Sequence, residues 1–123
     1  MTPFGERVRQ LRRQRGVTLR AMAEELHLSA AYLSALEHGR RSRPSTGLVQ
    51  QICAYFGLIW DDAEDLQRLA RLSHPRVVVD TAGLSPAKTE LANLLAERIR
   101  ALPESTIAEA IDILGPRPRR ARN

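Results

Sequence analysis

The 123 residues are 43 % apolar but only 4 % aromatic, so the core must be built from Leu, Ile, Val and Ala, which favours packed helices over aromatic-rich strands. The single cysteine, Cys53, excludes an intrachain disulfide and a metal site of several thiolates, and no run of 18 apolar residues predicts a membrane span. The formal net charge of +5 is uneven, because residues 1–43 carry nine arginines against four glutamates, whereas residues 44–115 are net acidic. A polyanion would therefore meet the N-terminal region first.

Five helices with very short connections are predicted in the first 72 residues. Four of them start at residues that can cap a helix, namely Thr2, Thr18, Ser29 and Ser45. Asp61-Asp62 opens the fifth helix, where its negative charge lies at the positive end of the helix dipole. The connection His27-Leu28 between the second and third helices is the shortest, so those two helices must cross at a steep angle.

The chain changes character after His74-Pro75, which breaks the fifth helix. Residues 76–80 contain the only β-branched run and are predicted to be extended. A long helix is predicted from Ser85-Pro86 to Pro103, followed by a last helix that Gly115 stops. The sequence thus predicts an all-α fold with a five-helix domain over residues 1–73, a helical region over 74–115 and a disordered basic tail over 116–123.

Residues 17–41 resemble the helix-turn-helix of the XRE family, which includes the lambdoid phage repressors and Cro proteins. The resemblance covers about residues 4–72. It is carried at fixed spacing by Ala23, Leu26, Ser29, Leu33, Leu36, the Glu37-His-Gly39 ending and the basic stretch closed by Pro44-Ser45. It implies a lambda-repressor-like DNA-binding domain whose third helix enters the major groove of double-stranded DNA.

The resemblance also assigns DNA contacts. On the third helix and its two ends they are Ser29, Ala30, Ala31, Tyr32, Ser34, Ala35 and His38, and Thr18 and Arg20 approach the backbone or the groove rim. Alanines cannot form bidentate hydrogen bonds, but they can touch thymine methyl groups and allow close approach. Tyr32 is interpreted either as a phosphate contact or as partly core.

Basic residues flank the expected reading helix. Arg40, Arg41 and Arg43 lie in a loop that the family places along the DNA backbone, and the N-terminal arginines are expected on the same side. The alternative is a solvated basic loop. The resemblance further pairs Glu37 with Arg12 of the first helix, as a pair that positions the motif rather than reading bases.

Nothing in the sequence indicates catalysis. His27, His38 and His74 have no partners at metal-ligand spacing, and there is no glycine-rich phosphate loop. We therefore expect no enzyme activity, no metal and no cofactor. The first seven residues lack the apolar segment of a signal peptide, so a cytoplasmic location is expected.

The C-terminal region is predicted to build a homodimer. Its interface residues are Val77, Val79, Leu91, Leu94, Leu95 and Ile99. The leading hypothesis is a homodimeric repressor that binds a pseudo-palindromic operator, because two linked DNA-binding domains bind more tightly than one. Two alternatives stay open. The apolar face could pack on the chain's own fifth helix, or the region could bind a toxin protein, which would make the chain an antitoxin.

Overall fold

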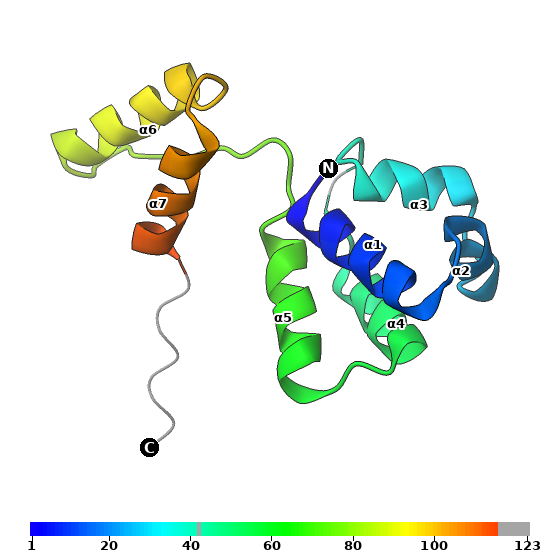
Figure 1. Ribbon diagram of the computed structural model, residues 1–123. Helices are drawn as coiled ribbons and strands as arrows, with labels where there is room; N and C mark the ends of the chain where they lie inside the picture. Colours follow the sequence, from blue (N-terminus) through cyan, green and yellow to red (C-terminus); the bar gives the residue numbers. More distant parts are fainter. Residues whose placement is uncertain (42, 116–123) are drawn as a thin grey trace. The chain divides into compact units, whose positions relative to one another are not determined.

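The computed structural model describes residues 1–41 and 43–115, and all regular structure in that part is helical (Figure 1). The helices are α1 (Pro3–Arg15), α2 (Leu19–Glu25), α3 (Ala30–Glu37), α4 (Thr46–Phe56), α5 (Trp60–Arg71), α6 (Pro86–Arg98) and α7 (Glu104–Leu114). The predicted all-α class is confirmed. The chain divides into two compact units, one formed by residues 1–77 and one that begins at Val78. The predicted disordered tail, residues 116–123, lies outside the described residues.

Local capping explains where most helices begin. The hydroxyls of Thr2, Thr18, Ser29, Ser45 and Ser85 each accept a hydrogen bond from a backbone amide in the first turn of the following helix. Helix α5 differs, because it begins at Trp60 and Ile59 at its cap position offers no side-chain hydrogen bond. The predicted start at Asp61 was therefore one residue late.

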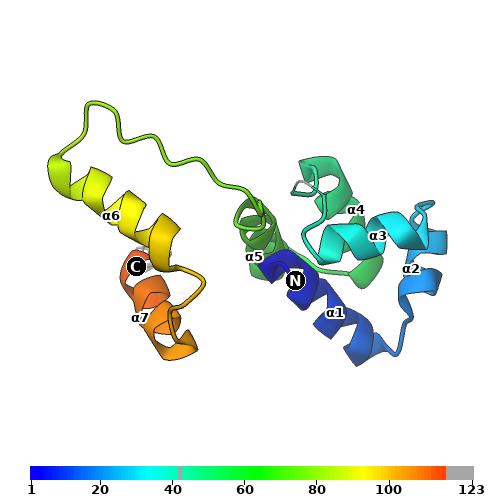
Figure 2. The ribbon, with the colours of Figure 1, turned by 90° about the horizontal axis from the view of Figure 1, so that it is seen from above.

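The core of the first unit is built mainly from aliphatic side chains of all five helices. It consists of Phe4, Val8, Met22, Ala23, Leu33, Leu36, Leu48, Val49, Ile52, Cys53, Phe56, Leu66 and Ala70. Helix α1 packs against both α3 and α5, while α2 packs on α3 and α4 packs on α5 (Figures 1 and 2). Burial raises the pKa of the Cys53 thiol, as expected for a small core residue. This packing fixes α3 on α1 and α2.

The second unit buries fewer of its side chains than the first. No residue of α6 or α7 is buried, and the predicted interface residues Leu91, Leu94, Leu95 and Ile99 are 36–56 % exposed. Helix α6 ends at Arg98 rather than running to Pro103, because residues 99–102 form turns. Residues 76–80 form no strand. None of the helices in the described part is long and apolar enough to cross a membrane.

Candidate nucleic-acid interface

Helix α3 presents a surface of small side chains. The hydroxyl of Ser29 accepts a hydrogen bond from the backbone amide of Tyr32 at 3.0 Å, which fixes the first turn. Leu33, Leu36 and Glu37 are buried. Of the remaining predicted contacts, Ala31 and His38 are exposed, and Ala30, Tyr32, Ser34 and Ala35 are half-buried. The outward face of α3 can therefore approach a partner closely but carries few hydrogen-bonding groups.

The turn before α3 has the tight geometry that the sequence predicts. Thr18 caps α2 by accepting the amide of Ala21 at 3.0 Å, and Arg20 is exposed on the same helix. His27 adopts a left-handed backbone conformation with φ 57°, which is uncommon for a residue other than glycine. Ala23 is fully buried where α2 packs on α3, so a larger side chain there would separate the two helices.

The far end of α3 is held by Glu37. The guanidinium of Arg12 donates to both carboxylate oxygens at 2.9 and 3.1 Å, so the ion pair implied by the resemblance is present. Burial raises the pKa of Glu37 above its ordinary value, and the neighbouring Arg12 opposes that rise. The carbonyl oxygen of Glu37 also accepts the backbone amide of Thr2 at 3.0 Å. The backbone and the side chain of Glu37 thus both bind α3 to the first helix.

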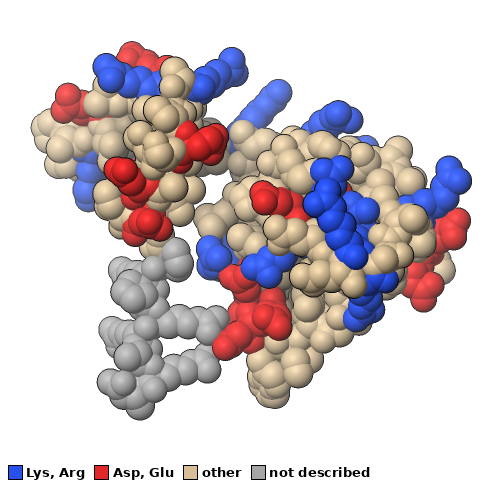
Figure 3. Space-filling model, in the orientation of Figure 1, with Lys and Arg blue, Asp and Glu red and all other residues tan. Residues whose placement is uncertain are grey.

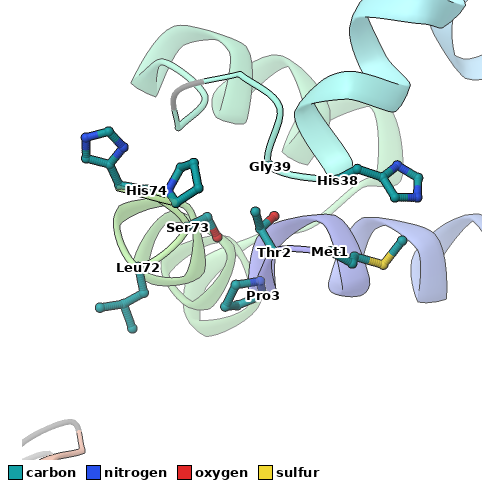
Figure 4. Close-up of a pocket in the computed structure, with 9 residues that line it drawn as sticks. Met1, Thr2, Pro3, His38, Gly39, Leu72, Ser73 and His74 are labelled. Atoms are coloured by element: carbon teal, nitrogen blue, oxygen red, sulfur yellow. The ribbon is translucent and has the colours of Figure 1, made fainter. Parts of the chain in front are cut away.

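The start of α1, the end of α3 and the end of α5 meet around a hollow of about 260 Å³ (Figure 4). The hydroxyl of Ser73 accepts the backbone amide of Phe4 at 2.9 Å and ties α1 to the end of α5. In Figure 4 the imidazole rings of His38 and His74 point away from one another, so they do not converge on a ligand. Within the described residues, no group of three or more His, Cys, Asp or Glu is placed to hold a metal ion. The hollow marks a structural junction that fixes α3.

The arginine loop, defined by Arg40, Arg41 and Arg43, follows α3. The backbone amide of Arg40 donates to the carbonyl of Ala35 at 2.9 Å, so the loop begins folded against the helix. All three arginines are exposed, and no carboxylate of the described residues pairs with them. The guanidinium of Arg41 lies 5.5 Å from the centre of the Tyr32 ring. Tyr32 also packs partly against the core, which is one of the two interpretations that the sequence left open, and its contact with a phosphate stays a prediction.

Three of the N-terminal arginines have partners within the first unit, whereas Arg9 and Arg13 are exposed. Arg7 pairs with Asp65 of α5 at 2.8 Å, and Arg12 pairs with Glu37. Arg15 donates to the carbonyl oxygens of Tyr55 and Phe56 at the end of α4. Figure 3 shows basic side chains over α1 and a cluster of acidic side chains over α5. The Arg12–Glu37 pair was predicted, but the partners of Arg7 and Arg15 were not, because they depend on how helices cross and no local pattern identifies them.

Comparisons with known proteins agree with this geometry. The family model described as a helix-turn-helix domain matches residues 3–69. The chain is 35 % identical over 54 residues to the uncharacterized HTH-type transcriptional regulator RghRB of Bacillus subtilis, a match that covers 44 % of this chain and 39 % of that protein. It is 39 % identical over 57 residues to the HTH-type transcriptional regulator DdrOP3 of Deinococcus deserti, a match that covers 46 % of this chain and 43 % of that protein.

The chain therefore spans about two fifths of the length of these curated relatives. No solved structure matches it. The family match covers more than half of the chain and includes α1 to α4 with most of α5, which are the helices that build and support the candidate interface. The protein belongs to the helix-turn-helix domain family.

Proposed function

We propose that the chain is a DNA-binding transcriptional regulator, and that α3 enters the major groove of double-stranded DNA. The observation that carries the proposal is the arrangement around α3. Its small outward face is held rigidly by the Arg12–Glu37 ion pair, and the arginine loop beside it has no carboxylate partner among the described residues. Phosphates would supply the missing negative charge, while Ala30, Ala31 and Ala35 allow close approach to base edges. The names of the two relatives support the regulatory role.

We further propose that the active form is a homodimer joined through α6 and residues 77–79, and that it acts as a repressor. Leu91, Leu94 and Leu95 are at least 36 % exposed, and Val77 and Val79 are 70 % and 65 % exposed. Apolar side chains spaced along one helix favour burial against a partner. A second copy of the chain offers the same face, and two linked domains raise the affinity for a two-part site.

Selection of bound sequences from a pool of random duplexes tests the proposal with the full chain. We expect enrichment of a pseudo-palindrome whose half-sites lie about 10 base pairs apart or a multiple of that spacing. Affinity for the enriched duplex should fall steeply as salt rises, because several phosphates are contacted by each domain. A pool that stays random after repeated rounds would contradict DNA recognition, and a single unrepeated half-site would contradict the dimer.

The antitoxin alternative makes a different prediction for the second unit. It requires that α6 and α7 bind a second kind of protein rather than another copy of the chain. Both helices have defined starts, with Ser85 capping α6 and Pro103 preceding α7, as expected for a region that is folded before a partner arrives. We therefore favour the dimer, and light scattering of the purified chain separates the two, because only the dimer doubles the mass without a second protein.

A further inference from the structure

Tyr32 and Arg41 form a contact that links α3 to the arginine loop. The guanidinium carbon of Arg41 lies 5.5 Å from the centre of the Tyr32 ring, which is within the range of a cation–π interaction. The ring is half-buried and packs partly on the core, so its position is fixed by the fold. Arg41 itself is exposed. A rigid ring thus restrains a long, charged and accessible side chain.

The outward face of α3 lacks a side chain of this kind. Its alanines have no polar groups, and the hydroxyl of Ser34 sits on a short side chain. The Nδ1 atom of His38 lies 2.9 Å from the carbonyl oxygen of Ser34, which occupies one of its two ring nitrogens. Arg41 is therefore a long hydrogen-bond donor that the structure ties to α3 although it belongs to the loop.

We propose that Tyr32 is a positioning residue that holds Arg41 beside α3, so that the guanidinium binds hydrogen-bond acceptors of the DNA. The inference rests on the proposed function. A free arginine side chain loses much rotamer freedom when it binds, and restraining it on a ring beforehand reduces that loss. Contact through the ring face leaves the N–H edge of the guanidinium available for a guanine edge or a phosphate.

The test is a double-mutant cycle on the full chain, read out by fluorescence anisotropy. The probes are the labelled duplex enriched from the random pool and a scrambled duplex of the same length. Arg41→Ala should weaken binding to the enriched duplex about tenfold. Tyr32→Leu should weaken it about threefold, whereas Tyr32→Phe, which keeps the ring, should bind within about twofold of the unchanged chain.

The coupling between the two residues decides the inference. When Arg41 is already alanine, Tyr32→Leu should not weaken binding to the enriched duplex any further. In the Arg43→Ala background, which serves as the matched control, Tyr32→Leu should still weaken binding by its full factor. A loss confined to the enriched duplex assigns Arg41 to a base edge, and an equal loss on both duplexes assigns it to a phosphate. Additive losses of Tyr32→Leu and Arg41→Ala would overturn the inference.

Two further outcomes keep the test decisive. If Tyr32→Phe binds as weakly as Tyr32→Leu, the hydroxyl itself contacts DNA and Tyr32 does not act through Arg41. If Tyr32→Leu fails to fold, because the ring packs on the core, Tyr32→Met keeps most of the volume without the ring and carries the same expectations. An unchanged chain that binds no duplex contradicts the proposed function, whereas normal binding without coupling contradicts only this inference.

Discussion

Glu37 shows how one residue can fix the orientation of a helix. Its carboxylate binds Arg12, its carbonyl oxygen accepts the amide of Thr2, and its backbone lies directly against Gly5. A Cβ atom at Gly5 would overlap the carbonyl oxygen of Glu37, so glycine is required for this close approach of α1 and α3.

A glycine-to-alanine comparison tests that close approach. Gly5→Ala should lower the free energy of unfolding by about 1–3 kcal/mol, because the two helices must move apart. Gly47→Ala is the control, since a Cβ at Gly47 of α4 meets no atom within 4 Å. The control should raise stability by about 0.5 kcal/mol, because alanine has less freedom in the unfolded chain. Urea denaturation followed by circular dichroism measures both, and equal effects of the two substitutions would refute the close approach.

Removal of Arg12 should leave the Glu37 carboxylate buried without its cation. We expect Arg12→Ala to cost about 3 kcal/mol of unfolding free energy at pH 7. Arg12 opposes the rise that burial causes in the pKa of Glu37, so its removal raises that pKa further. The cost should therefore shrink as the pH is lowered toward 4.5 and the carboxyl becomes protonated. A cost that is the same at pH 7 and pH 4.5 would show that the ion pair is not its source.

Among the helices, the residue at which each one begins could be predicted from sequence better than the side chains that it contacts. The caps at Thr2, Ser29 and Ser45 depend on three or four consecutive residues, and all three are present. The sequence predicted the end of α6 too late, because residues 99–102 contain no glycine or proline that would mark the end of a helix at Arg98. The contact of Arg41 with Tyr32 could not be predicted, since it depends on the path of the loop.

Arg15 connects two elements that are distant in sequence, and its removal is a test at this scale. It donates to the carbonyl oxygens of Tyr55 and Phe56 at 3.0 and 2.6 Å, where α4 ends and its carbonyls lack partners within the helix. Arg15→Ala should lower the free energy of unfolding by about 1–2 kcal/mol. Arg13→Ala, an exposed arginine on the same helix, should change it by less than about 0.5 kcal/mol. Equal losses measured by urea denaturation would argue against the capping role.

At the scale of the whole molecule, the two units differ in how well they bury their apolar residues. The first unit encloses a core drawn from five helices, whereas α6 and α7 bury no residue. The sequence showed that the second unit is helical and apolar. It could not show what covers the exposed face, because a single chain does not specify its partner.

The dimer is tested by placing a charge on that face. Leu94→Asp should shift the mass measured by light scattering from two copies of the chain to one, because a carboxylate would be buried without a partner. The same substitution should weaken binding to the enriched duplex. Ile113→Asp is the control, since Ile113 is 83 % exposed on α7 and lies outside the proposed interface. A monomeric unchanged chain would remove the basis for the dimer.

A carboxylate placed on the exposed face of α3 tests directly whether this helix lies against DNA. Ala31→Glu should weaken binding to the enriched duplex by about 100-fold or more, because the carboxylate would face phosphates and base acceptors at close range. Ala54→Glu introduces the same charge at an exposed position of α4 and should leave binding within about threefold of the unchanged chain. If a folded Ala31→Glu chain binds the enriched duplex normally, that result would contradict the placement of α3 in the groove, whatever the effect of Ala54→Glu.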